Sequence, residues 1–332
     1  MITLLLGGLL AAVYFLLRVT LLKLPRCKSD AKLHGKTVVI TGASSGIGKE
    51  TAMDLARRGA RVILACRDRE RAEAAVQEII QETGNQQVLF MQLDLASLLS
   101  VRTFAENLLQ SESRLDLLIN NAGVLSDGQT DDGFGMMFGV DHLGHFLLTV
   151  LLLDRLKTSG PSRVVTVASN SYRRSKLDFS VLLDHRDSAL GSNYSQIYKK
   201  YCNSKLCNIL FTCELSRRLQ GTNVTCYSLH PGLIRTQLGR YLGIWMKVFV
   251  MPFFYLLFAD PKSGAQTTLY CALEQGIEHL SGHFFSCCTL QLNIGSKARD
   301  DAAARKLWDL SESFCRLSKT HKLVSGDGSG FS

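Results

Sequence analysis

The sequence is poor in proline and lacks paired-cysteine motifs. Only 5 of its 332 residues are proline, 20% are charged and 46% are hydrophobic. This balance excludes a disordered chain, which would be poor in apolar residues and rich in charge, and it excludes collagen-like repeats. The ten cysteines form no C-x-x-C pair and no finger-like Cys/His spacing. We therefore interpret them as buried thiols in a reducing compartment; an oxidised, secreted protein is the alternative.

A long run of lysine and arginine is also missing. The 38 Lys+Arg against 29 Asp+Glu give a net charge of +9, but no basic stripe and no known nucleic-acid reader motif is present. We therefore predict no nucleic-acid partner. Much of the basic excess lies directly after an apolar N-terminal run, at Lys23, Arg26, Lys28, Lys32 and Lys36. That placement points to a membrane surface.

The N-terminal run predicts a membrane anchor over residues 1–24. Residues 1–17 carry no charged side chain. As a helix they would span about 26 Å, and extension to Leu22 gives about 33 Å, with Arg18 near the end where it can snorkel. A cleaved signal peptide is the alternative, although no Lys or Arg precedes the run and no A-x-A site follows it. A retained anchor with this basic flank places the rest of the chain on the cytosolic side, whereas cleavage would give a secreted or lumenal protein.

After residue 33, short β-branched runs alternate with amphipathic stretches. We predict strands over 36–41, 61–65, 88–93, 116–120, 163–168 and 223–228, and helices over 46–58, 69–82, 97–110, 138–156 and 201–219. Continuous apolar strands between helices are typical of a parallel sheet covered on both faces. Right-handed crossovers then give a Rossmann-type, doubly wound α/β fold. We expect one catalytic domain over 34–315 and a flexible tail over 324–332.

A glycine-rich turn follows the first predicted strand. Residues Thr41–Gly48 read TGASSGIG, and a helix follows. Glycines let the backbone turn tightly and approach a pyrophosphate, whose negative charge suits the helix N-terminus. We therefore predict a dinucleotide site here. Its residues are Gly42, Ser44, Ser45, Gly46, Ile47 and Gly48.

The end of the second predicted strand favours NADP(H) over NAD. An acidic residue there would bond the ribose 2′-hydroxyl, but the sequence has Arg67, whose planar guanidinium can pair with a 2′-phosphate. Asp68 follows one position later and keeps NAD open as an alternative. A surface arginine without this role is the other alternative.

Tyr201 and Lys205 are four residues apart, so on a helix they share one face. A lysine ammonium beside a tyrosine favours the phenolate, which lets the phenol exchange a proton with a substrate oxygen during hydride transfer. The same spacing occurs at Tyr172 and Lys176, but in a polar stretch with no amphipathic helix behind it. We therefore predict that Tyr201 opens a helix and is the catalyst, and that Tyr172 is loop surface.

Several longer motifs extend this pattern along most of the chain. They are TGASSGIGKETA at Thr41–Ala52, LACRD at Leu64–Asp68, LDLASL at Leu93–Leu98, NNAG at Asn120–Gly123, HLGHFLLT at His142–Thr149, YCNSK at Tyr201–Lys205, HPG at His230–Gly232 and RKLWDLS at Arg305–Ser311. In combination they resemble the short-chain dehydrogenase/reductase superfamily, and within it the microsomal retinol dehydrogenase group.

The resemblance implies a role for each matching position. It implies Tyr201 as the acid/base, Lys205 as the residue that holds the nicotinamide ribose and tunes Tyr201, and Ser169 as a hydrogen-bonding partner of the substrate oxygen. The further implied cofactor contacts are Asp94, Leu95, Asn121, Ala122, Gly123, Pro231, Gly232 and Thr236. The resemblance also implies a retinoid-like substrate, an endoplasmic reticulum membrane location and a homodimer.

One position departs from the family's pattern. The family usually has Asn where this chain has Asp141, and that Asn belongs to a proton relay with lysine and water. Asp keeps acceptor oxygens but loses the amide donors and adds a charge. Either Asp141 holds Lys205, or the relay is impaired. The second case would make the protein a catalytically weak, NADPH-binding membrane scaffold or sensor, which is the alternative to an enzyme.

An apolar stretch over residues 241–258 follows the last predicted strand and is interrupted by Lys247 and Pro252. We predict a hydrophobic lid over the substrate that also dips into the bilayer, with a purely structural helix pair as the alternative.

The histidines do not suggest a metal site. His142, His145 and His230 lack metal-ligand spacing, so we interpret them as core or hydrogen-bonded histidines and predict no metal. Taken together, the sequence predicts a membrane-anchored, NADP(H)-dependent oxidoreductase. It interconverts an alcohol and a carbonyl on an apolar substrate, with retinol/retinal as the leading pair.

Overall fold

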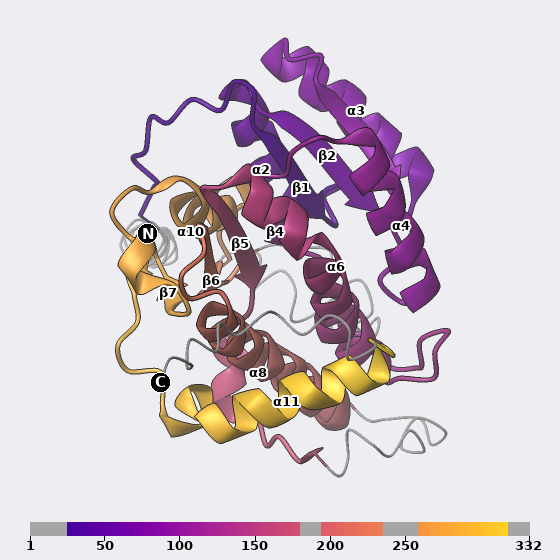
Figure 1. Cartoon of the computed structure of the whole chain (residues 1–332), viewed down its shortest axis with the longest axis vertical. Coiled ribbons are helices and arrows are strands. Elements are labelled where there is room, and N and C mark those ends of the chain that lie inside the picture. The colour runs from indigo at the N-terminus through magenta and orange to yellow at the C-terminus, as the bar shows by residue number, and fades with distance from the viewer. Residues whose placement is uncertain (1–24, 180–193, 235–257, 318–332) are drawn as a thin grey trace, which may run out of the picture.

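The computed structural model describes residues 25–179, 194–234 and 258–317, which form an eight-stranded sheet between layers of helices (Figure 1). The strand order is β3-β2-β1-β4-β5-β6-β7-β8, and every neighbouring pair is parallel except β7 with β8. The strands are β1 (Thr37–Thr41), β2 (Arg61–Cys66), β3 (Val88–Gln92), β4 (Leu117–Asn120), β5 (Ser162–Val167), β6 (Val224–His230), β7 (Phe284–Ser286) and β8 (Thr289–Leu290). The predicted Rossmann-type, doubly wound fold is confirmed, and its last strand turns back antiparallel.

Helices cover both faces of this sheet. The longer ones are α2 (Gly46–Arg57), α3 (Arg69–Thr83), α4 (Leu98–Ser111), α6 (Gly144–Ser159), α8 (Tyr194–Arg218), α10 (Pro261–Leu273) and α11 (Asp301–Phe314). Short turns of helix are α5 (Met136–Phe138), η1 (Gly139–Leu143), η2 (Asn170–Arg174), η6 (Glu278–Leu280) and η7 (Ser296–Arg299). The two main hydrophobic clusters place α2, α3 and α10 against one face and α4, α6 and α8 against the other.

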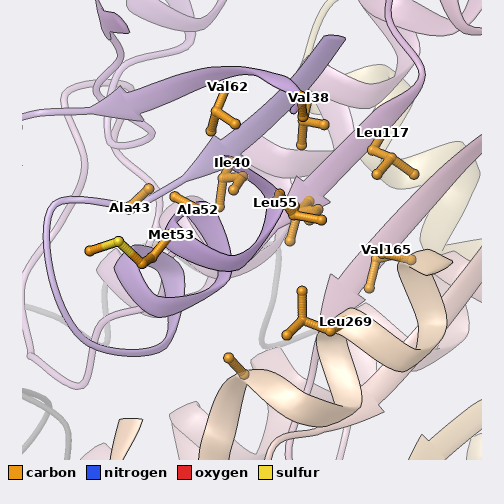
Figure 2. Packing of buried hydrophobic residues seen from close by; sticks show 14 of the residues in the cluster. Val38, Ile40, Ala43, Ala52, Met53, Leu55, Val62, Leu117, Val165 and Leu269 are labelled. Atoms are coloured by element: carbon orange, nitrogen blue, oxygen red, sulfur yellow. The ribbon is translucent and has the colours of Figure 1, made fainter. Parts of the chain in front are cut away.

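The alternation of side chains along each strand builds these two cores. In β1, Val38 and Ile40 pack with α2 and α10, whereas Val39 between them packs with α4 and α6. Figure 2 shows the first cluster, in which Leu55 of α2 and Leu269 of α10 approach the sheet. Burying one such side chain contributes about 1.5–3 kcal/mol, so a strand apolar on both sides stabilises both layers.

Helix α11 lies outside α8, and the picture shows it crossing that helix (Figure 1). Trp308 of α11 stacks on Phe211 with the ring centroids 6.0 Å apart, and it meets Phe146 edge-on at 4.9 Å. The guanidinium of Arg218 lies 4.3 Å from the Trp308 ring centroid. These contacts cover apolar faces of α6 and α8 that would otherwise be exposed to water.

Residues 136–159 form one continuous helix through α5, η1 and α6. Its middle turn η1 is a π-helix, in which the Gly144 N–H reaches the Gly139 carbonyl, five residues back. Within the described residues this is the one helix long and apolar enough to cross a membrane, but 78% of its most apolar window is buried inside the protein. It is therefore a buried helix that packs against the sheet.

The ten cysteines are all free thiols. The prediction that they are buried is confirmed for Cys66, Cys202, Cys207, Cys226, Cys271 and Cys315, and the other four are half-buried.

Some predictions fall on residues that the structure does not describe. These are the anchor over 1–24, the cofactor contact Thr236, the lid over 241–258 except its last residue, and the tail over 324–332. The largest error in a helix boundary is at α8, which begins at Tyr194, so Tyr201 lies two turns inside the helix instead of opening it.

Candidate active site

The glycine turn lies between β1 and α2, where the strand order reverses from β2 on one side of β1 to β4 on the other. Ligands of open α/β sheets bind at such a switch point. Gly42 has φ +65°, and a Cβ there would lie 2.9 Å from Cα of Ala122. A Cβ on Gly48 would lie 2.5 Å from Nδ2 of Asn121. Both glycines therefore allow the turn to pack directly against the segment that follows β4.

The N-terminus of α2 is open to an anion. Ser45 precedes the helix but makes no side-chain cap, and the first turn contains no acidic residue. Gly46 has φ +60°, and a Cβ there would meet nothing within 4 Å. Among the described residues, four other α-helices have side-chain caps, made by Asp68, Ser97, Asp260 and Asp300. The uncapped N–H groups and the positive end of the helix dipole fit the pyrophosphate of a dinucleotide.

The hydroxyl of Thr41 ties this turn to its neighbours. It accepts the N–H groups of Asn121 at 2.9 Å and Ala122 at 3.0 Å, and it lies 2.8 Å from Nε2 of His145. Nδ1 of His145 lies 3.0 Å from the main-chain carbonyl of Asp141. A carbonyl only accepts, so Nδ1 carries the hydrogen and Nε2 accepts from Thr41. Burial lowers the pKa of His145 to about 4, which keeps this imidazole neutral at physiological pH.

Tyr201, Lys205 and Ser169 come together at the end of β5. The Tyr201 side chain of α8 hydrogen-bonds the side chain of Ser169, which directly follows the strand. Lys205 lies one helical turn after Tyr201, with Nζ 5.4 Å from the tyrosine ring centroid and 3.5 Å from the carbonyl of Val167. The structure thus brings together the three residues that the sequence pointed to.

Asp141 completes this group from η1 and is completely buried. Its Oδ1 accepts the Val124 N–H at 2.8 Å, and its Oδ2 accepts the Ser204 hydroxyl at 2.8 Å. The same Oδ2 lies 3.7 Å from Nζ of Lys205. A Cβ on Gly123 would lie 3.2 Å from that Nζ, so the lysine rests against bare backbone. Asp141 therefore pairs with Lys205, which was one of the two outcomes predicted for this substitution.

The charges in this group act on one another. Burial raises the pKa of Asp141, and Lys205 and the hydrogen bond from Val124 oppose that rise. Burial first, and then the charge of Asp141, raise the pKa of Tyr201, while its hydrogen bond with Ser169 lowers it. A phenol in this setting carries its proton at neutral pH.

Arg67 directly follows β2 and is exposed. Because β2 is the parallel neighbour of β1, Arg67 lies at the same edge of the sheet as the glycine turn. Asp68 is already engaged: it caps α3 by accepting the Arg71 N–H at 3.1 Å, and its carboxylate lies 4.0 Å from Nε of the same arginine. Asp68 thus has a structural role as the cap of α3.

The other predicted cofactor residues lie on loops that follow strands. Asp94 follows β3 and accepts the Ala96 N–H at 2.9 Å, and Leu95 is buried beneath α6. Pro231 and Gly232 follow β6, where Gly232 has φ +99°.

The two remaining residues of the turn make packing contacts. The side chain of Ser44 hydrogen-bonds the thiol of Cys66. Ile47 packs against Gly264 of α10, because a Cβ on that glycine would lie 2.9 Å from Cγ1 of Ile47.

The prediction that Tyr172 is loop surface was wrong. Its side chain is fully buried, and its hydroxyl donates to the carbonyl of Ile294 at 2.8 Å. Its hydroxyl is thus committed to a structural hydrogen bond, whereas Tyr201 meets Ser169 and Lys205.

Sequence reasoning left Thr41, His145 and Ser204 out of the site. Two signals were present: His145 follows Asp141 by four residues, the spacing of one helix face, and Ser204 lies inside the YCNSK motif. The interpretation of the histidines as buried is confirmed, because His142, His145 and His230 are each at most 9% exposed. Among the described residues, no group of three or more His, Cys, Asp or Glu side chains is arranged to hold a metal ion.

Comparison with known proteins gives consistent matches. The family profile for short chain dehydrogenase matches residues 36–181. Dehydrogenase/reductase SDR family member 13 of Bos taurus is 52% identical over 95% of this chain and 82% of that protein. Retinol dehydrogenase 11 of Mus musculus is 48% identical over 86% of this chain and 88% of that protein. Retinol dehydrogenase 14 of Mus musculus is 50% identical over 84% of this chain and 86% of that protein.

Solved structures share the fold. An uncharacterised protein from Mycobacterium paratuberculosis aligns with a TM-score of 0.68 at 36% identity, over 86% of this chain and 96% of that one. A short chain dehydrogenase of Shigella flexneri complexed with NADP aligns with a TM-score of 0.60 at 22% identity, over 77% of this chain and 98% of that one. The second similarity concerns the fold alone.

Proposed function

The chain belongs to the short-chain dehydrogenase/reductase family of oxidoreductases and is related to retinol dehydrogenases, and from this premise we propose that it interconverts an alcohol and a carbonyl on an apolar, retinoid-like substrate with NADP(H). The observation that carries the proposal is a series of close approaches. A Cβ on Gly42 would lie 2.9 Å from Cα of Ala122, and a Cβ on the adjacent Gly123 would lie 3.2 Å from Nζ of Lys205. That Nζ lies 5.4 Å from the centre of the Tyr201 ring. This series of close approaches supports the proposal that a nucleotide bound at the glycine turn reaches toward Tyr201.

In the proposed reaction the nicotinamide of bound NADP(H) supplies or accepts the hydride. Tyr201 gives its phenol proton to the substrate oxygen during reduction and takes a proton from it during oxidation. Ser169 hydrogen-bonds the same oxygen and orients it toward Tyr201. Lys205 holds the ribose and sets the electrostatic environment of the phenol.

The cofactor site is proposed from groups that fit its charges. The uncapped N-terminus of α2 and the open side of Gly46 suit the pyrophosphate. Arg67 is proposed to pair with the 2′-phosphate of NADP(H), since Asp68 is used as a helix cap. Retinol as substrate comes from the names of the relatives, together with the apolar residues 241–258 in the sequence.

We also propose that residues 1–24 anchor the protein in the endoplasmic reticulum membrane with the catalytic domain in the cytosol. Support comes from the uncharged apolar run and the basic residues after it. Protease added outside intact microsomes should digest the catalytic domain. Full protection of that domain would refute this orientation.

The function is tested with the full-length protein in detergent micelles, all-trans-retinal and either NADPH or NADH. Wild-type protein should reduce retinal with NADPH. Tyr201→Phe should lower kcat by about 10²–10⁴-fold, the usual contribution of a general acid. Tyr270→Phe in α10 is the matched control and should stay near wild type, because Tyr270 packs against Phe285 in the cluster on the opposite face of the sheet. No turnover of retinal or of any other apolar carbonyl by the wild type would refute the proposal.

The cofactor preference has its own test. Arg67→Ala should raise the KM for NADPH by about 10–100-fold, the equivalent of one charge-assisted hydrogen-bonded pair, and leave the KM for NADH unchanged. Arg57→Ala, at the exposed far end of α2, is the control. Equal effects of Arg67→Ala on both cofactors would contradict the 2′-phosphate contact.

A further inference from the structure

Three donors converge on the buried carboxylate of Asp141. The Val124 N–H and the Ser204 hydroxyl donate to separate oxygens at 2.8 Å each, and the Lys205 ammonium lies 3.7 Å from Oδ2. A protonated carboxyl must donate from one oxygen, whereas an ionised carboxylate accepts at both. The Ser204 hydroxyl also lies 2.9 Å from the Tyr201 carbonyl, but the Val124 N–H and the Lys205 ammonium can only donate. These two donors favour the charged form of Asp141 and oppose the burial that raises its pKa.

Lys205 lies close to three groups. Its ammonium lies 3.7 Å from Oδ2 of Asp141, 3.5 Å from the Val167 carbonyl and 5.4 Å from the centre of the Tyr201 ring. Because the positive charge is paired with a buried negative one, the field that Lys205 exerts on the phenol is largely cancelled.

The other groups around Tyr201 add no positive charge. From its own helix α8 it is faced by Tyr198 and Cys202, which both raise its pKa, and from the end of β5 by the hydroxyl of Ser169. From the helix 136–159 it is faced by Asp141, and the neighbouring His145 is neutral. The cation that faces the Tyr201 ring is Lys205, and its charge is paired with Asp141.

We propose that Asp141 is a positioning residue that neutralises Lys205 and keeps the Tyr201 hydroxyl protonated, so that this site is set for carbonyl reduction rather than alcohol oxidation at neutral pH. The inference rests on the proposed function. Reduction needs a phenol that gives a proton, and oxidation needs a phenolate that takes one. The charge state that Asp141 favours is the one that reduction uses.

The test is the pH profile of Asp141→Asn in both directions. Asn has nearly the same shape but no charge, so the phenol should ionise at a pH lower by about one unit or more. The oxidation profile should shift by that amount, and the oxidation rate at pH 7 should rise about 10-fold, with reduction at pH 7 changed far less. Asp127→Asn is the matched control: it removes a carboxylate that pairs with Lys200 of α8 at 3.1 Å, and it should leave the profile in place.

Two outcomes overturn the proposal. The first is an oxidation profile of Asp141→Asn that coincides with wild type. The second comes from the wild-type protein alone, which keeps the test valid if the variant does not fold: ¹³C NMR of labelled protein should show Asp141 ionised and Tyr201 protonated at pH 7, and the opposite state of either group would refute the inference. This titration needs no turnover, so a protein that reduces no carbonyl would refute the proposed function while still reporting on Asp141.

Discussion

Acidification should weaken the folded state through His145. Its ring is 1% exposed, donates from Nδ1 to the carbonyl of Asp141 and accepts at Nε2 from Thr41. Protonation would convert Nε2 into a donor, break the contact with Thr41 and place a positive charge in the core. The folded protein therefore favours the neutral imidazole.

The size of this loss of stability follows from the change in the pKa of His145 on folding. The pKa of His145 falls from its ordinary value of 6.5 to about 4 on folding. A group whose folded pKa is depressed in this way takes up its proton more readily in the unfolded chain, so its contribution to stability is complete above about pH 6.5 and is lost as the pH falls toward 4. Between pH 7.5 and pH 5 the loss from this one residue is about 2 kcal/mol.

The assay is urea unfolding of the full chain in micelles at pH 7.5 and pH 5. His145→Gln lowers stability at both values but does not titrate, so the difference between the two pH values should shrink by about 2 kcal/mol relative to wild type. His283→Gln replaces an exposed histidine and should leave that difference unchanged. If His145→Gln shows the same pH difference as wild type, the buried imidazole is not the titrating group and the reasoning fails.

Two further substitutions probe the site. Gly123→Ala would place a methyl group 3.2 Å from Nζ of Lys205, so we expect kcat/KM for carbonyl reduction to fall by about 10-fold or more with a shift in stability below about 1 kcal/mol; unchanged steady-state kinetics would show that the lysine tolerates displacement. Tyr172→Phe removes the hydrogen bond to Ile294 and should cost about 1 kcal/mol in urea unfolding while retaining activity. A loss of activity as large as that of Tyr201→Phe would mean that the wrong tyrosine has been assigned.

The central sheet could be predicted because its strands are apolar on both sides and alternate with amphipathic helices. The predicted strand over 61–65 differs from β2 by one residue, and the predicted helix over 46–58 differs from α2 by one. The β7–β8 hairpin gave no such signal. Its strands have three and two residues, and its turn passes through Cys287 and Cys288, both at φ +52°, where glycine or asparagine is the usual choice.

The site residues that lie in short sequence motifs could be predicted. Ser169 directly follows β5, and Tyr201 and Lys205 share one face of α8, which packs beside the end of that strand. The error at Tyr172 arose because its burial depends on Ile294, which is 122 residues away in the sequence. A polar local stretch carries no information about a partner so distant.

The contact between Asp141 and Lys205 could not be predicted from the sequence, because it depends on the π-helical turn within the helix 136–159. The wide turn Gly139–Leu143 takes up one residue more than an ordinary helical turn of equal rise. Loss of a single residue there would be absorbed locally, and α6 would keep its place on the sheet. A neighbour such as Val140 or His142 would then take the position facing the lysine. Deletion of one codon could thus change the side chain that faces Lys205 without changing the fold. A descendant of this chain could in this way reverse the direction of reaction proposed above while it keeps the same architecture.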